Sequence, residues 1–158
     1  MKILGIDPGL ATIGLGLIEA NSPQELTVID WLTITTPANT PLPDRLKEIH
    51  DDLSTYIAEH QPDRAVVETL FFETNVKTAI DVAQARGVIL QTIAEHALEL
   101  IEVSPMQLKA AITGDGNADK QQVQDMLVYT LKLDEVPQPD DAADALALAI
   151  YGSLQNLN

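Results

Sequence analysis

The 158-residue chain contains no cysteine. This absence excludes disulfides, thiolate metal ligands and cysteine nucleophiles, so oxygen atoms or imidazoles must hold any bound metal. Long apolar runs are also missing: no segment approaches the roughly 20 apolar residues of a membrane span. The apolar start is interrupted by Asp7 and is too short for a signal peptide. Hydrophobic residues still make up 46% of the chain, so we expect one cytoplasmic domain over residues 1–158.

Positive charge is scarce. Nine Lys and Arg residues face 24 Asp and Glu residues, which gives a net charge of −15. Nucleic-acid binders usually carry a basic footprint, and this composition argues against a broad one. A solvated acidic surface accounts for most of the excess, because a metal site uses only a few carboxylates. If the chain binds DNA, its few basic residues must gather on one face.

Two hydrophobic patterns organise the chain. Short apolar or β-branched runs predict strands over residues 3–7, 11–20, 26–36, 65–68 and 100–103. Apolar residues at helical spacing predict helices over residues 44–60, 75–98, 104–112, 119–131 and 140–154. The first three strands follow one another through turns and predict an antiparallel meander. The later two alternate with helices, so we expect an α/β fold with a five-stranded mixed sheet flanked by helices.

Two carboxylates stand where predicted strands end. Asp7 follows the first apolar run and precedes Pro8 and Gly9, and Glu68 closes the run over residues 65–68. Strand ends are where α/β proteins place ligand-binding and catalytic groups. A single carboxylate there can also be an ordinary turn residue. Two in the same setting favour a functional site.

A second pair of carboxylates lies in the segment DDAADALA, residues 140–147. Asp141 and Asp144 are three positions apart, so they share one helix face, where like charges are unfavourable without a cation. Asp141 could act only as a helix cap, an explanation that suits Asp144 less well. Together with Asp7 and Glu68 they offer hard oxygen donors that suit Mg²⁺ or Mn²⁺. Such a set around two ions is typical of phosphodiester hydrolysis.

Basic and aromatic residues near these acids have two interpretations each. Lys109 and Lys120 flank the glycine-rich segment 113–117 and either meet a phosphate or are simply solvated. The only phenylalanines, Phe71 and Phe72, follow Glu68 closely. They either pack in the core or stack on an unpaired base. The three histidines fall in predicted helices and are interpreted as surface or structural residues: His50, His60 and His96.

Several segments together match one family. The segments GIDPG (5–9), QARG (84–87), PMQLK (105–109), ADK (118–120) and DAADALA (141–147) occur in the order and at the spacing of the RuvC Holliday junction resolvases. GIDPG alone would be a weak signal, but the combination is specific. The chain resembles this family from its start almost to its end.

The resemblance implies an RNase H-like fold and a homodimeric, Mg²⁺-dependent endonuclease, with Mn²⁺ also possible. It implies two ions in each active site and symmetric nicking of a four-way DNA junction. By position, the metal-binding catalytic acids would be Asp7, Glu68, Asp141 and Asp144. The DNA-contacting residues would be Lys109, Lys120, Phe71 and Asn75. Arg86 would lie in the dimer-forming region, and a branch-migration motor of the RuvA and RuvB type would be a partner.

Two features depart from the family pattern. The residues after Phe71 usually have basic character, but here they read Phe72-Glu73-Thr74-Asn75-Val76-Lys77. The basic residues that many members carry after the last helix do not appear before Asn158. Phosphate contacts set both DNA affinity and its dependence on salt. These departures therefore predict weak, salt-sensitive DNA binding and leave the chemistry unchanged.

Three alternative functions share parts of this pattern. Actin-like and sugar-kinase ATPases also begin with a strand, an acid and a glycine turn, but they need two such domains, for which 158 residues are too few. A junction-binding module without activity would have no need of all four acids. Another RNase H-like nuclease, acting on a different nucleic acid, agrees with the acids equally well. Only the family resemblance selects the junction.

Overall fold

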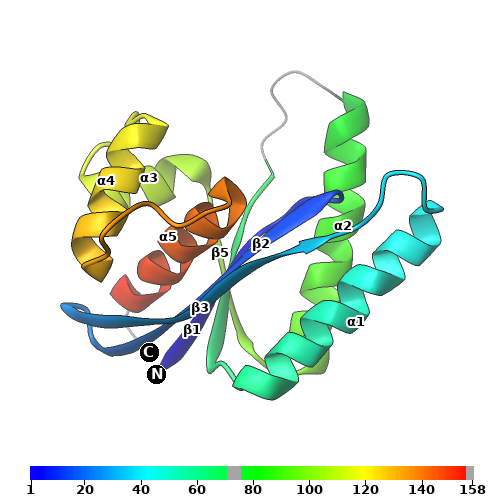
Figure 1. Ribbon diagram of the computed structural model, residues 1–158, viewed down its shortest axis with the longest axis horizontal. Helices are drawn as coiled ribbons and strands as arrows, with labels where there is room; N and C mark the ends of the chain where they lie inside the picture. Colours follow the sequence, from blue (N-terminus) through cyan, green and yellow to red (C-terminus); the bar gives the residue numbers. More distant parts are fainter. Residues whose placement is uncertain (71–75, 156–158) are drawn as a thin grey trace.

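A five-stranded mixed sheet forms the centre of the computed structural model, which describes residues 1–70 and 76–155 (Figure 1). The strands are β1 (Lys2–Asp7), β2 (Thr12–Ser22), β3 (Glu25–Thr35), β4 (Arg64–Glu68) and β5 (Glu99–Val103). They lie in the order β3-β2-β1-β4-β5. Adjacent strands among β1, β2 and β3 are antiparallel, whereas β1, β4 and β5 run parallel. The predicted three antiparallel and two parallel strands are confirmed.

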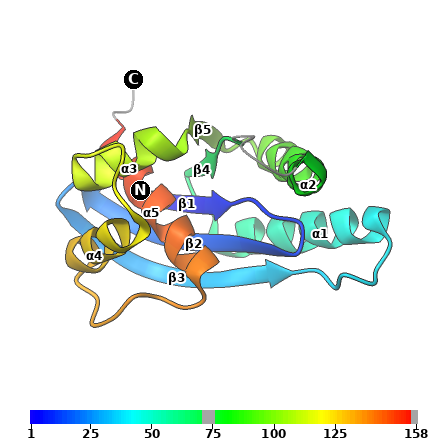
Figure 2. The same ribbon diagram turned by 90° about the horizontal axis from the view of Figure 1, so that it is seen from above.

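The described helices cover both faces of this sheet. They are α1 (Leu42–His60), α2 (Val76–Glu95), α3 (Pro105–Thr113), α4 (Lys120–Leu131) and α5 (Asp140–Leu154). Figures 1 and 2 show α3, α4 and α5 on one face and α1 and α2 on the other. None of these helices is both long and apolar enough to span a membrane.

Alternation along the strands divides the apolar residues between two cores. In β1, Ile3 packs with α3, α4 and α5, whereas Leu4 and Ile6 pack with α1 and α2. In β4, Val66 faces the first core and Val67 the second. Successive strand residues point to opposite faces, so Asp7 and Glu68 share the face of Ile3 and Val66. Both acids therefore point toward the layer that contains α5.

The predicted end of the long helix is wrong by three residues. The periodicity predicts a helix to residue 98, but α2 ends at Glu95. Ala97 has a left-handed φ of 54°, and the N–H of Leu98 donates back to the Ile93 carbonyl at 3.2 Å. These contacts turn the chain so that β5 can begin at Glu99, beside Arg64 of β4. Parallel strand pairing therefore overrides a helical pattern that continues beyond the real end.

Helix α5 lies directly against the backbone of β1 and β2. An ideal Cβ added at Gly5 would lie 1.8 Å from the Ala145 carbonyl oxygen, and one at Gly14 would lie 1.9 Å from the Asp141 carbonyl oxygen. Both distances are far inside van der Waals contact, so only glycine fits at these positions. The sequence of α5 complements this approach, because its buried face is rich in alanine. Main-chain contact thus brings the acidic start of α5 close to the end of β1.

Replacing Gly5 with alanine is expected to push α5 away from the sheet. Overpacking a filled interior costs about 1–3 kcal/mol, and here the clash is with main chain, so we expect a loss of at least about 2 kcal/mol in the free energy of unfolding. Thermal melting would show this as a fall of about 4–8 °C. The double variant Gly5→Ala/Ala145→Gly is the control. It gives no rescue, since the clashing atom at Ala145 is its carbonyl oxygen. An unchanged melting temperature in Gly5→Ala would contradict the close approach.

Candidate active site

Asp7 and Glu68 lie side by side at one edge of the sheet. Strands β1 and β4 are parallel neighbours, and Ile6 pairs with Val67, so the next residues in the same register are the two acids. Asp7 also pairs with Gly14 of β2, where the Asp141 carbonyl of α5 packs. Two strand ends and the start of α5 therefore meet at this edge, although the three segments are far apart in the sequence.

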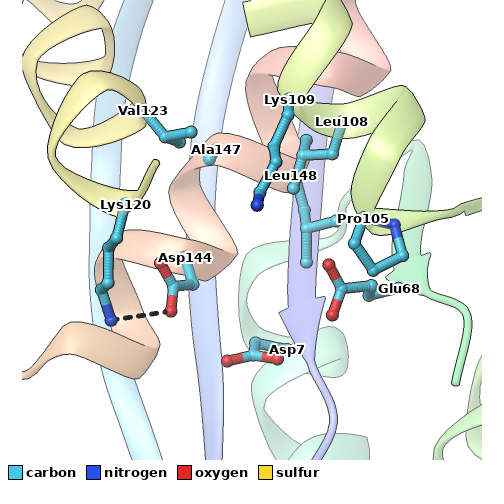
Figure 3. A pocket seen from close by; sticks show the side chains of 10 residues that line it. All are labelled: Asp7, Glu68, Pro105, Leu108, Lys109, Lys120, Val123, Asp144, Ala147 and Leu148. Atoms are coloured by element: carbon cyan, nitrogen blue, oxygen red, sulfur yellow. Dashed lines mark hydrogen bonds and ion pairs between the residues drawn. The ribbon is translucent and has the colours of Figure 1, made fainter. Parts of the chain in front are cut away.

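A cavity of about 210 Å³ opens at this meeting point (Figure 3). Five charged side chains line it: Asp7, Glu68, Lys109, Lys120 and Asp144. Its remaining wall is apolar and comes from α3, α4 and α5: Pro105, Leu108, Val123, Ala147 and Leu148. The structure thus brings three of the four predicted acids, with both predicted lysines, into one pocket. Asp141 is not among the lining residues and lies one helical turn before Asp144.

Burial and mutual repulsion disfavour the charged forms of the acids in this pocket. Burial raises the pKa of Asp7 to about 8, with further contributions from Asp144, Glu68 and Asp141, while Lys120 acts in the opposite direction. Burial and then Asp144 raise the pKa of Glu68, which Lys109 lowers. Burial also raises the pKa of Asp144, opposed by Lys120. A strongly perturbed carboxylate group in a cleft is typical of a functional site.

The donor set fits a hard divalent cation. Carboxylate oxygens are the ligands that Mg²⁺ and Mn²⁺ prefer, and a cation would offset both the burial and the like-charge repulsion that raise the pKa of Asp7. Within residues 1–70 and 76–155, no group of three or more Asp, Glu or His side chains is arranged so that it could hold a metal ion. Mg²⁺ does not need such a group, since it usually binds through one or two carboxylates and takes further oxygens from water and substrate phosphate. The arrangement is that of an open site.

Capped helix starts bring the two lysines to the pocket. Ser104 and Gln107 form a capping box at the start of α3, which carries Lys109. Asp119 and Gln122 form another at the start of α4, whose first residue is Lys120. Each cap satisfies backbone N–H groups that would otherwise lack partners, and so fixes where its helix begins.

Lys120 also bonds to the start of α5. Its Nζ lies 3.0 Å from Asp140 Oδ2 and 3.4 Å from Asp144 Oδ2. The pairing with Asp140 was not predicted, because a contact between α4 and α5 leaves no trace in local spacing. It holds one ammonium group beside the acids while leaving Lys109 to face the cavity from the other wall (Figure 3).

The remaining predicted residues fall into two groups. Phe71 and Asn75, together with Phe72, lie outside the described residues. Arg86, predicted in the dimer-forming region, lies on α2 with its side chain turned toward the sheet. It donates to the Glu68 carbonyl oxygen at 3.0 Å and forms an ion pair with Glu102. Its side chain is only 15% exposed.

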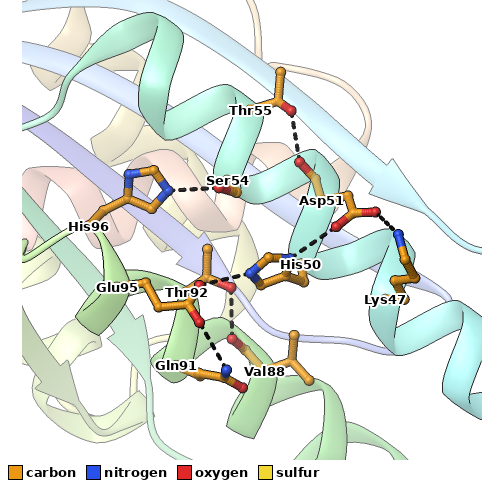
Figure 4. A network of polar contacts seen from close by, with 10 residues as sticks. All are labelled: Lys47, His50, Asp51, Ser54, Thr55, Val88, Gln91, Thr92, Glu95 and His96. Carbon is orange, nitrogen blue, oxygen red and sulfur yellow. Dashed lines mark hydrogen bonds and ion pairs between the residues drawn. The ribbon is translucent and has the colours of Figure 1, made fainter.

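None of the three histidines, which the sequence analysis interpreted as surface or structural residues, lines the pocket. His50 contacts Asp51 and Glu95 at 3.0 and 2.8 Å, and these contacts raise its pKa. His96 contacts Ser54 at 2.8 Å (Figure 4). These contacts connect α1 with α2 and its C-terminal turn on the far face of the sheet. They have a structural role in joining the two helices.

Known proteins share this sequence and fold. The family model described as crossover junction endodeoxyribonuclease RuvC matches residues 3–152. Proteins of that name from Desulfitobacterium hafniense and Halothermothrix orenii are similar to the chain. The first is 50% identical over 150 residues, covering 95% of this chain and 90% of the relative. The second is 49% identical over 159 residues, covering 100% and 96%.

Solved structures agree with the sequence matches. The Thermus thermophilus RuvC structure superposes with a TM-score of 0.87 at 32% identity, covering 95% of this chain and 92% of that chain. The same protein in complex with Holliday junction substrate gives a TM-score of 0.91 at 30% identity, covering 98% and 96%. This similarity confirms the RNase H-like fold that the sequence resemblance implied. The chain belongs to the RuvC family of crossover junction endodeoxyribonucleases.

Proposed function

We propose that this chain resolves four-way DNA junctions by nicking two opposing strands symmetrically, through two-metal phosphodiester hydrolysis. The observation that carries the proposal is the pocket in which Asp7, Glu68 and Asp144 meet Lys109 and Lys120. The resemblance to Thermus thermophilus RuvC, whose structure was determined with a Holliday junction substrate, supports the choice of DNA. We also treat residues 1–158 as one nuclease domain, since the described helices cover the two faces of one sheet.

Membership of the family implies use of a divalent metal, and we propose Mg²⁺, replaceable by Mn²⁺, with two ions in each site. Asp7, Glu68, Asp141 and Asp144 would hold them. Such ions activate water and stabilise the leaving oxygen of the phosphodiester. Burial raises the pKa of Asp7 to about 8, with further contributions from Asp144, Glu68 and Asp141, so a bound cation would favour its charged carboxylate. We include Asp141 among the metal-binding acids because its charge raises the pKa of Asp7.

Lys109 and Lys120 would bind phosphates of the DNA at the pocket. Each lies beside an acid whose pKa it lowers, Glu68 for Lys109 and Asp144 for Lys120. Their positive charge is local, in a chain with a net charge of −15. We therefore expect affinity to fall steeply as salt rises, because few phosphate contacts must work against general repulsion. Phe71 and Asn75 stay predicted DNA contacts.

The test is a synthetic four-way junction incubated with Mg²⁺ at low salt, beside linear duplex DNA and an RNA–DNA hybrid. We expect paired nicks at symmetric positions in the junction and little cutting of the other two substrates. Equal cutting of the hybrid would favour the alternative of a different RNase H-like nuclease. Binding of the junction without nicking would favour the alternative of a junction-binding module without activity. Failure of the junction to be bound or cut would overturn the proposal.

We propose that the active form is a homodimer, since symmetric nicking needs two sites. Gly87 supports α2 as the interface, since it lies exposed in mid-helix and an added Cβ would meet nothing within 4 Å. A glycine within a helix lowers stability by about 1 kcal/mol relative to alanine. Close packing of a second copy against α2 would explain why glycine occupies this position. A branch-migration motor of the RuvA and RuvB type would be a further partner.

The variant Gly87→Leu is expected to weaken the dimer at least tenfold while the protomer stays folded. The larger side chain has room in the protomer but would separate two closely packed helices. Light scattering after gel filtration measures the association, and circular dichroism checks the fold. A wild-type monomer at micromolar concentration would contradict the dimer. An unchanged dimer in Gly87→Leu would remove Gly87 from the interface.

A further inference from the structure

Arg86 connects α2 to the strand end that carries Glu68. Its Nε donates to the Glu68 carbonyl oxygen at 3.0 Å, and its Nη2 forms an ion pair with Glu102 of β5. The Arg86 side chain is 15% exposed, so little water competes for these contacts. One guanidinium group therefore joins α2 to the ends of β4 and β5.

The peptide unit that follows Glu68 is held at both ends. Its carbonyl oxygen accepts from Arg86, and its N–H, which belongs to Thr69, donates to the Val103 carbonyl oxygen at 2.8 Å. A peptide unit is planar, so fixing both of its polar groups fixes its orientation. The orientation of this plane sets the backbone at Glu68, and with it the direction in which the Glu68 side chain leaves the strand.

Glu68 needs such support because of where it lies. It is the last residue of β4, so the ladder that holds earlier strand residues ends here. Its side chain also lies near Asp144, which repels it and contributes to its raised pKa. Reactive side chains must be held within about 0.5 Å of their working positions. A terminal strand residue under like-charge repulsion does not meet that demand by itself.

We propose that Arg86 is a positioning residue, which holds Glu68 in its working place through the Glu68 carbonyl oxygen and the ion pair with Glu102. The proposal rests on the proposed function, since it assumes that Glu68 takes part in cleavage. Arg86 itself does not line the pocket. Its effect is transmitted through the backbone of β4, and Glu102 orients the guanidinium from the neighbouring strand.

The chain offers a matched control at the other end of β4. Arg64 donates to Glu99 of β5 at 2.8 Å and to the carbonyl oxygens of Gly152 and Gln155 at 2.8 and 3.1 Å, so it too combines a β5 acid with backbone carbonyl groups. Arg64 lies four residues before Glu68, roughly 13 Å along the strand. A change there removes the same kind of contact without touching the pocket. Comparison of the two arginines therefore separates support of Glu68 from general support of the sheet.

The experiment compares Arg86→Met, Arg86→Lys, Glu102→Gln and the control Arg64→Lys in the full-length protein. Four quantities are measured: the single-turnover rate of cleavage of a prebound junction in Mg²⁺, junction affinity in Ca²⁺, Mn²⁺ affinity without DNA by calorimetry, and mass by light scattering. Changes to residues that orient metal ligands typically cost about 10–100-fold in metal affinity or activity. We expect Arg86→Met to lose rate and Mn²⁺ affinity in that range, with junction affinity and mass unchanged.

Lysine at position 86 can keep one of the two contacts, so Arg86→Lys is expected to recover part of the rate. Glu102→Gln keeps an acceptor without the charge and is expected to fall between wild type and Arg86→Met. Arg64→Lys is expected to cleave at the wild-type rate below its melting temperature. A wild-type rate and Mn²⁺ affinity in Arg86→Met would overturn the proposal.

Two other outcomes would also overturn it. A loss of rate that accompanies conversion to monomer, and that disappears at high protein concentration, would assign Arg86 to the dimer. An equal loss in Arg64→Lys would show general support of the sheet. Failure of the wild-type protein to cleave a junction would instead overturn the proposed function. In that case the Mn²⁺ affinity would by itself test the role of Arg86, because that measurement needs neither DNA nor cleavage.

Discussion

Replacing Asp7 with asparagine is expected to lower the rate of junction cleavage by about a thousandfold. The amide keeps the size of the carboxylate but loses its charge. A bound metal contributes several kcal/mol of charge stabilisation in the transition state, and about 1.4 kcal/mol corresponds to a factor of ten in rate. Asp7 is the acid on which the other three act most directly, since Asp144, Glu68 and Asp141 all raise its pKa. Its loss should therefore disturb the whole set.

The same change is expected to make the metal-free protein more stable. Because the pKa of Asp7 is raised to about 8, the folded protein keeps a proton that the unfolded chain has lost between about pH 4 and pH 8. Stability therefore falls as pH rises through this window and levels off above it. Asparagine removes this pH-dependent penalty, so at pH 8 we expect a gain of at least about 1 kcal/mol, or about 2–4 °C in melting temperature.

Single-turnover cleavage and melting curves from pH 5 to pH 9, the latter without and with Mg²⁺, measure both effects on Asp7→Asn. Mg²⁺ is expected to raise the melting temperature of the wild type and to have a smaller effect on the variant, since only the wild type offers the full carboxylate set. Asp52→Asn is the matched control, because Asp52 is exposed on α1 across the sheet from α5. Cleavage by Asp7→Asn at the wild-type rate would remove Asp7 from the mechanism.

Replacing Arg64 with methionine is expected to cost about 2–4 kcal/mol in the free energy of unfolding. The Arg64 side chain is fully buried and donates to the carbonyl oxygens of Gly152 and Gln155 near the end of α5, as well as to Glu99. Methionine fills similar space but leaves those carbonyl oxygens without their donor. Glu99 is half exposed and can be hydrated, so the cost comes chiefly from the carbonyl groups and from the lost charge at a helix C-terminus.

Thermal melting would show this loss as a fall of about 4–16 °C, with the transition still cooperative. Lys47→Met is the control, because it removes an exposed ion pair with Asp51 on α1 and is expected to leave the melting temperature unchanged. A melting temperature in Arg64→Met equal to that of the control would show that the buried guanidinium contributes no net stability.

Much of the pocket could be predicted because local rules place its acids. The apolar runs before Asp7 and Glu68 identify two strands whose ends point the same way, and parallel pairing then brings the acids together. Helical spacing put Asp144 on one face with Asp141, and α5 does begin at Asp140. Lys109 and Lys120 were singled out because they flank the glycine-rich segment, the family resemblance favoured DNA contact over simple solvation, and the cavity contains both. The roles of these residues stay predictions.

The parts that could not be predicted depend on contacts between distant segments. Spacing alone did not show that Asp141 stays outside the lining of the cavity while Asp144 enters it. Nor did it show the pairing of Lys120 with Asp140, or the contacts of Arg86 with Glu68 and Glu102. Gly87 lies in mid-α2, and an added Cβ there would meet nothing within 4 Å in the described residues. Such features depend on how the helices pack on the sheet. The residue pattern of a single helix does not give that packing.

The glycine contacts between β1, β2 and α5 have a consequence for how this fold tolerates sequence change. Where side chains separate two elements, a larger or smaller core residue moves one relative to the other. Here main-chain atoms meet directly at Gly5 and Gly14, so the spacing is set by the dimensions of the polypeptide itself. Substitutions in the surrounding core can shift α1 or α2, while the distance between Asp7 and the acids of α5 stays the same. The geometry of the pocket is thus insulated from the mutations that diversify the rest of the interior.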